Sequence, residues 1–192
     1  MPKSDLLLKH YDEYTSKFRG KEIVLGCGNA DSRLLLIGEA PGKEEVRLSR
    51  PFVGTAGRYL SEFLGYIGVQ RDSIYITNAI KFRLFKTDPK TGRMSNRPAT
   101  RDEIYENRIY LLKEIDIIRP VHIVTLGNVP LKSVTGDFSI SIGNVHGKIW
   151  PVNILDMNYM LFALYHPASI IYNRSLRDTY INDIKKLEYL ID

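Results

Sequence analysis

Three polar side chains that could take part in a reaction come at or just after the ends of short apolar runs. They are Glu39, Asn78 and His166. A partly buried carboxylate can orient or deprotonate a water molecule, and burial raises its pKa toward that task. A neutral imidazole can donate a hydrogen bond to a departing oxyanion, which is worth about 3 kcal/mol. We therefore expect an active site if the fold brings the three side chains together.

Two of the candidate residues would suit a planar base. Phe52 lies on a loop constrained by Pro51 and Gly54, where its ring could stack on a base at about 1–3 kcal/mol. The Asn78 amide donates from one atom and accepts at the other, so it could pair with uracil and reject cytosine, whose edge pattern is opposite. Each residue also has a structural alternative: a core aromatic for Phe52, a turn cap for Asn78 and a structural imidazole for His166.

A long polar stretch, residues 86–101, contains prolines and a glycine and has no apolar periodicity. We predict a loop there, and its length suggests a function. The stretch and the residues before it are rich in cations that could contact phosphates on either side of an extruded nucleotide, unless they are only a solvated surface. These cations are Lys81, Arg83, Lys86, Lys90, Arg93, Arg97 and Arg101.

The apolar patterns predict alternating strands and helices. Strands are expected at 34–37, 73–78, 121–126 and 160–165, and helices at 4–18, 59–67, 103–118, 130–135 and 176–190. Residues 137–158 are expected to form an irregular or hairpin-like connection. This order predicts an α/β fold with a parallel sheet covered on both faces. Because the carboxyl ends of parallel strands share one edge of the sheet, the candidate residues would face one crevice there.

The composition is that of an ordinary globular protein, with 44% hydrophobic and 26% charged residues among 192. We expect one domain over residues 1–192, a monomer, with no membrane partner and a cytoplasmic location, because no run reaches about 20 apolar residues and no signal peptide is recognisable. The single cysteine, Cys27, excludes an internal disulfide and a metal site of several thiolates. The net charge of +5 permits a polyanionic partner without establishing one.

The motifs together resemble the uracil-DNA glycosylase superfamily, most closely its family 4, whose members carry an iron–sulfur cluster. The resemblance covers residues 23–190 and rests on residues 38–42, 50–57, 76–81, 96–97, 103–104 and 166–168, with Asn173 and Leu176. It implies a three-layer α/β/α sandwich around a four-stranded parallel sheet. It also implies a DNA repair enzyme that flips uracil out of DNA and hydrolyses its N-glycosidic bond, leaving an abasic site.

The resemblance also implies roles for individual residues. Gly38, Glu39 and Ala40 would line the uracil pocket, Phe52 would stack on the base, Asn78 would read its edge and His166 would face its O2. Glu39, with Glu45 as a candidate helper, would position the attacking water, so Glu39, Glu45 and His166 are the candidate catalytic residues. Ile170 and Ile171 fall in the segment that would wedge into the DNA gap.

The chain departs from family 4 at the cluster. Phe82 and Asn107 stand at two of the four cysteine positions, and the amino-terminal pair is replaced within residues 11–18. A cluster with four cysteine ligands is therefore impossible within one chain, and we predict no cofactor and no metal, with apolar packing in the cluster's place.

Two other functions stay open. A catalytically silent DNA-binding or damage-recognition protein is favoured by Val46, where the family has an acidic residue, and by Tyr172, where it has an arginine. A glycosylase for another deaminated base, such as hypoxanthine, would need a wider pocket.

Overall fold

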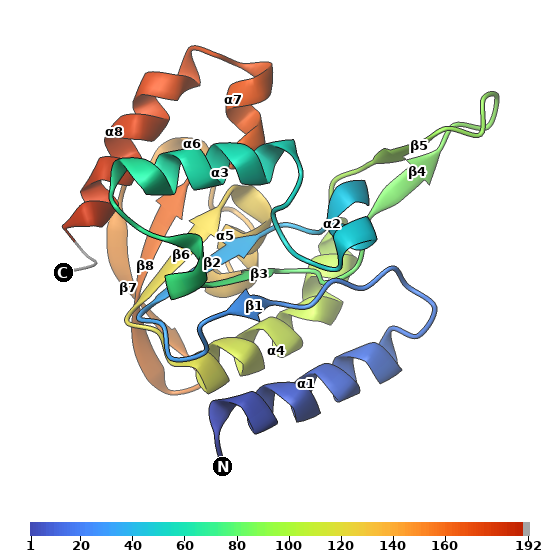
Figure 1. The fold of residues 1–192 in the computed structure, drawn as a ribbon, viewed down its shortest axis with the longest axis horizontal. Helices are drawn as coiled ribbons and strands as arrows, with labels where there is room; N and C mark the ends of the chain where they lie inside the picture. Colours follow the sequence, from blue (N-terminus) through green and yellow to red (C-terminus); the bar gives the residue numbers. More distant parts are fainter. Residues whose placement is uncertain (190–192) are drawn as a thin grey trace.

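The computed structural model describes residues 1–189, in which one mixed sheet lies between two groups of helices (Figure 1). Its strands, in spatial order, are β1 (Cys27–Gly28), β3 (Tyr75–Asn78), β2 (Leu34–Gly38), β6 (His122–Leu126), β8 (Met157–Leu164) and β7 (Ile149–Ile154). The middle four are parallel to one another, whereas β1 and β7 pair antiparallel at the edges. All four predicted strands are present, but the sheet is wider than the predicted four.

The two edge strands lack the continuous apolar runs by which the central strands were predicted. Only two residues form β1, and β7 alternates between more and less exposed positions. A tight turn at Leu155 and Asp156, both with positive φ (48° and 66°), joins β7 to β8. Two consecutive residues with positive φ are typical of the turns that join antiparallel strands. Residues 149–158 of the connection that was expected to be irregular or hairpin-like (137–158) thus form the outer strand and turn of a hairpin, whereas a short helix, Ile142–Val145, occupies part of its first half.

Alternate residues of the central strands pack on opposite faces of the sheet. In β2, Leu35 and Ile37 belong to one core, and Leu34 and Leu36 belong to the other. The first core includes residues of α1 (Lys3–Lys17), α4 (Arg101–Ile118), α5 (Asn128–Thr135) and α6 (Ile142–Val145). The second includes residues of α3 (Thr55–Tyr66), α7 (Ala168–Tyr172) and α8 (Leu176–Glu188). Because both faces are covered, these strands are largely apolar, with Thr77, Asn78 and Thr125 as buried polar exceptions.

The five predicted helices are present as α1, α3, α4, α5 and α8 and agree with the predicted ranges within a few residues at their ends, whereas the short helices α6 and α7 were not predicted. Only the predicted carboxyl end of the last helix, residue 190, lies outside the described residues. Two short elements, α2 (Lys43–Leu48) and the 3-10 helix η1 (Arg71–Ser73), complete the fold. Among residues 1–189, no helix is long and apolar enough to cross a bilayer.

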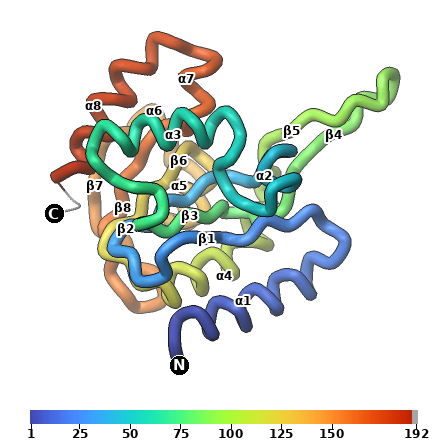
Figure 2. The backbone as a smooth tube through the Cα atoms, in the orientation of Figure 1, coloured from blue at the N-terminus to red at the C-terminus, as the bar shows by residue number. Residues whose placement is uncertain are grey.

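The stretch predicted as a loop, residues 86–101, is instead largely a β-hairpin that projects from the body of the molecule (Figures 1 and 2). Its strands are β4 (Phe85–Thr87) and β5 (Met94–Asn96), paired antiparallel. The Asp88 side chain closes the turn by accepting hydrogen bonds from the Lys90 and Thr91 N–H groups. Every residue of both strands is exposed, so the sequence has no apolar alternation that would predict strands here.

Candidate active site

The carboxyl ends of β2, β3 and β8 bring the candidate residues to one edge of the sheet. Gly38 and Asn78 are direct partners in the pairing of β2 with β3. A cavity of about 280 Å³ at this edge is lined by Ala40, Glu45, Phe52, Asn78 and His166, among others. A second cavity, of about 320 Å³, shares Ala40 and His166 with the first and adds Glu39. The residues that the sequence analysis grouped therefore do lie together.

The Phe52 ring and the Asn78 side-chain amide both lie close to the backbone of Gly38. A Cβ atom at this position would lie 2.4 Å from the Asn78 Oδ1 atom and 2.4 Å from the Phe52 Cζ atom. Any side chain here would displace both groups, so the close approach requires glycine. The Phe52 ring also faces the His166 ring, with 6.0 Å between centroids and 28° between planes.

The Asn78 side chain is nearly buried but free to bind a ligand. Only 3% of the residue is exposed, and it lines the first cavity. Its backbone carbonyl accepts a hydrogen bond from Lys81, whereas its side-chain amide has no hydrogen-bond partner within residues 1–189. The amide atoms are not among the fully buried unpaired atoms of the described residues, so the group reaches the surface of the cavity. This amide is therefore a candidate ligand-binding group.

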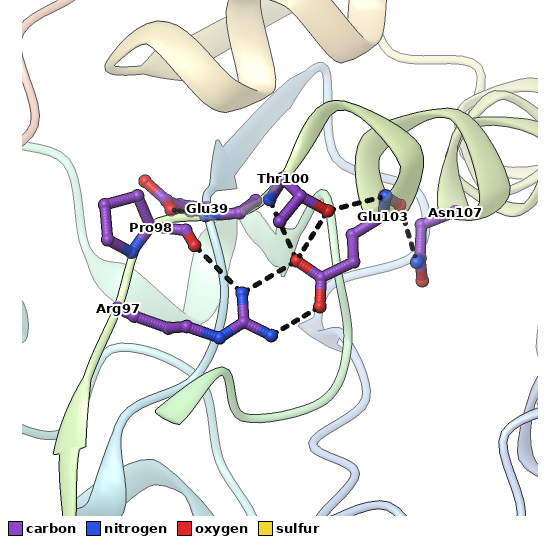
Figure 3. Close-up of polar contacts among 7 residues, drawn as sticks. Glu39, Arg97, Pro98, Thr100, Glu103 and Asn107 are labelled. Carbon is purple, nitrogen blue, oxygen red and sulfur yellow. Dashed lines mark hydrogen bonds and ion pairs between the residues drawn. The ribbon is translucent and has the colours of Figure 1, made fainter. Parts of the chain in front are cut away.

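The Glu39 carboxylate is held from the segment that precedes α4. Its Oε1 atom accepts a hydrogen bond from the Ala99 N–H group at 2.9 Å. Arg97 fixes this segment by donating to both oxygens of Glu103, at 2.8 and 2.6 Å (Figure 3). Burial raises the pKa of Glu39, and the Ala99 hydrogen bond opposes that shift in part. A carboxylate in this state can accept a proton from water more readily than an exposed one.

His166 is held as a neutral imidazole. Its Nδ1 atom accepts a hydrogen bond from the Ala168 N–H group at 3.1 Å, so a neutral ring carries its proton on Nε2. Burial lowers the pKa of His166 to about 4, although the negative charge of Glu45 opposes the shift. At neutral pH the ring is therefore an uncharged donor at Nε2.

Glu45 ties two loops together at the cavity. Its Oε1 atom accepts from the Val53 and Gly54 N–H groups at 3.1 and 2.8 Å, and its Oε2 atom accepts from Gly42 N–H at 3.1 Å. These contacts give the Glu45 carboxylate a structural role, because they hold the two loops together. Its help in placing water stays a prediction.

Comparison with known proteins agrees with this arrangement. The family model of the Uracil DNA glycosylase superfamily matches residues 25–187. The chain belongs to this superfamily. It is 35% identical to the type-4 uracil-DNA glycosylase of Archaeoglobus fulgidus over 85% of this chain and 79% of the relative. The identity is 36% to the type-4 enzymes of Saccharolobus solfataricus (90% of this chain, 77% of the relative) and Thermotoga maritima (88% and 83%).

The iron–sulfur cluster of family 4 does not fit this superfamily member. Cys27 is its single cysteine, and the described residues contain no group of three or more side chains suited to a metal. Aromatic packing lies where the cysteines were expected: the Phe18 ring is 4.5 Å from Tyr14 and 5.1 Å from Phe82, between centroids. The Tyr14 hydroxyl also donates to the Asn107 Oδ1 atom at 2.5 Å. Tyr14, Phe18 and Phe82 belong to a third small core that has no cysteine to bind iron.

The predicted DNA contacts at Lys81 and Arg83 are wrong. Lys81 is completely buried, with its Nζ atom 2.6 Å from the Glu114 carboxylate. Arg83 is 9% exposed, and its guanidinium is engaged by Asn96 and Glu22. Both lie in the stretch between β3 and β4, whose backbone is hydrogen-bonded to residues 22–24 before the chain emerges as the hairpin.

The remaining predicted cations lie nearer the surface. Arg97 is half-buried and engaged with Glu103, which lowers the pKa of that carboxyl to about 2. Lys86, Lys90 and Arg93 are exposed on the projecting hairpin. Arg101 is exposed as well, with its guanidinium over the rings of Tyr105 and Phe138. Contacts of these cations with DNA stay a prediction.

The two predicted wedge residues point in different directions. Ile170 is 3% exposed and belongs to the core beneath α7, so its prediction as a DNA wedge is wrong. Ile171 is 37% exposed and lines the first cavity together with Tyr172, which is 89% exposed. Of the two predicted residues, only Ile171 is placed to enter DNA.

The sequence did not predict a role for Asn96, which lies at the site. Asn96, at the end of β5, lines both cavities. Its Oδ1 atom accepts a hydrogen bond from Arg83, which leaves its Nδ2 group beside the Gly42 turn. The motif at residues 96–97 was the sequence signal available for Asn96. Nothing in the neighbouring residues showed that the end of the hairpin lies at the cavity.

Proposed function

We propose that this protein hydrolyses the N-glycosidic bond of deoxyuridine in DNA and leaves an abasic site. The observation that carries the proposal is the nearly buried Asn78 amide, which has no partner among the described residues and lies against Phe52. Such a pair suits a planar base that carries both donors and acceptors on its edge. The relatives named type-4 uracil-DNA glycosylases support uracil as that base.

In the proposed reaction the flipped base stacks on Phe52 and pairs with Asn78. Water, positioned by Glu39, bonds to C1′ of the deoxyribose and gives a proton to the carboxylate as the bond from C1′ to the base breaks. The bonding electron pair leaves with uracil. His166 donates from Nε2 to O2 of the departing anion, a contact worth about 3 kcal/mol in the transition state.

DNA would lie along the hairpin and across the mouth of the cavity. Lys86, Lys90 and Arg93 would contact phosphates beside the extruded nucleotide. Ile171, exposed at the cavity, would fill the gap that the flipped base leaves.

A labelled oligonucleotide with one U·G mismatch, incubated with the protein and then cleaved by alkali, tests the proposal. We expect a strand break at uracil. No abasic product from uracil in either single- or double-stranded DNA would refute the proposal. Binding without cleavage would support a catalytically silent DNA-binding protein. Cleavage at hypoxanthine alone would support a glycosylase for that deaminated base.

The variant Asn78→Asp tests the reading of the base edge. A carboxylate only accepts, so it loses the donor that uracil needs and suits the amino group of cytosine. We expect uracil excision to fall by about tenfold or more and cytosine excision to appear. Unchanged uracil excision with no action on cytosine would contradict this account of Asn78.

A further inference from the structure

Arg71, in η1, contacts the loop that carries the Phe52 ring. Its two terminal nitrogens donate to two consecutive backbone carbonyls: Nη1 to Phe52 at 2.6 Å, and Nη2 to Pro51. Arg71 is half-buried. A planar guanidinium presents two donors in a rigid fork, so it can hold two carbonyls at once in a way that lysine cannot.

The backbone at Phe52 needs such support. Its φ is +53°, in the left-handed region that costs a residue other than glycine about 1–3 kcal/mol. This conformation turns the Phe52 carbonyl toward α3, where a Cβ atom at Gly57 would lie 1.8 Å from the carbonyl oxygen. A strained conformation persists only where surrounding contacts determine it.

The loop is held from two sides. Arg71 binds the carbonyls of residues 51 and 52, and Glu45 binds the N–H groups of residues 53 and 54. The Phe52 ring then lies against Gly38 and faces His166. A change in the Phe52 backbone would therefore move the ring relative to the amide and the imidazole together.

We propose that Arg71 is a positioning residue for the ring that stacks on the base. The inference rests on the proposed function, in which Phe52 is that ring. Arg50 and Arg58 line a cavity of about 490 Å³ together with Arg71. They bind other groups, Asp72 and Thr55, so the two carbonyls depend on Arg71 within the described part of the chain.

The test compares Arg71→Met and Arg71→Lys with the matched control Arg58→Met, which removes the same charge from the same cavity. We expect Arg71→Met to lower kcat for uracil excision by about tenfold to a hundredfold, because a displacement of about 1 Å at a reacting group has that effect. Inhibition by free uracil should weaken by a similar factor. Arg71→Lys should fall between Arg71→Met and wild type, and Arg58→Met should leave both quantities unchanged.

A purely structural role for Arg71 would lower the melting temperature but leave kcat and uracil inhibition of the folded protein unchanged, and that result would overturn the proposal. Hydrogen exchange of residues 50–57 provides a readout that does not depend on activity. It should become faster in Arg71→Met and stay unchanged in Arg58→Met, and unchanged exchange in Arg71→Met would also overturn the proposal. If the wild-type protein excises no uracil, the proposed function fails by itself, and the exchange result still decides whether Arg71 holds the loop.

Discussion

Removing the charge of Lys81 tests the buried ion pair beneath the pocket. Its Nζ atom lies 2.6 Å from the Glu114 Oε2 atom, and both side chains are 0% exposed. The same carboxylate accepts hydrogen bonds from the hydroxyls of Tyr11 and Thr77. In Lys81→Met, Glu114 would therefore keep two hydroxyl partners and lose its only cation within the described residues.

The cost follows from burial. Removing one partner of a buried ion pair destabilises a protein by about 3–5 kcal/mol, because the remaining charge is left in a medium of low dielectric constant. The double variant Lys81→Met/Glu114→Gln removes both charges and keeps an amide oxygen for Tyr11. Its remaining loss is the hydrogen bond from Lys81 to the Asn78 carbonyl, at about 1–2 kcal/mol. We expect the double variant to be more stable than the single one by about 2–3 kcal/mol.

Urea unfolding followed by circular dichroism measures these differences, provided the m-value stays constant. The salt dependence of DNA binding by folded Lys81→Met should match that of wild type, because the side chain does not reach the surface. A stability loss below about 1 kcal/mol would refute the argument from burial, because exposed ion pairs contribute that little. A decrease of about one unit in the slope of log K against log salt would show instead that Lys81 contacts DNA.

Four further predictions concern the pocket and the DNA interface. The pKa of Glu39 is raised, and Glu39 must be ionised to accept a proton from water. As the pH falls, kcat/KM should therefore decrease at a pH above the ordinary pKa of a carboxyl group, and Glu39→Gln should abolish this dependence. His166 should add no transition between pH 6 and 7, because its pKa is about 4 and the ring is already neutral there. Neutralising Lys86, Lys90 and Arg93 should reduce the slope of log K against log salt by about 2.7, and an unchanged slope would show them to be solvated surface. Ile171→Ala should reduce the fluorescence change of 2-aminopurine placed beside uracil and leave stability unchanged, whereas Ile170→Ala should cost about 2–5 kcal/mol in urea unfolding. The opposite pattern would show that Ile170 enters DNA and that Ile171 packs in the core.

The residues of the pocket were predictable because the signal for them is local. Strands β2, β3, β6 and β8 are covered on both faces, so each is a largely apolar run that the sequence shows directly. The residues that follow such strands in a parallel sheet meet at one edge, whatever lies between them in the chain. Glu39, Asn78 and His166 were therefore grouped correctly without any knowledge of the loops.

The partners and exposure of the cations required the tertiary structure. Lys81 and Arg93 look alike in sequence, yet one is buried against Glu114, 33 positions away, and the other is exposed on a hairpin. Ile170 and Ile171 differ by one position, and one step along a helix turns the side chain by about 100° from core to surface. The sequence by itself determined which side chains at the strand ends reach the pocket, because buried strands are visible as local apolar runs. Only the folded chain decided which of the predicted cations and wedge residues are exposed, because burial depends on contacts between segments far apart in the sequence.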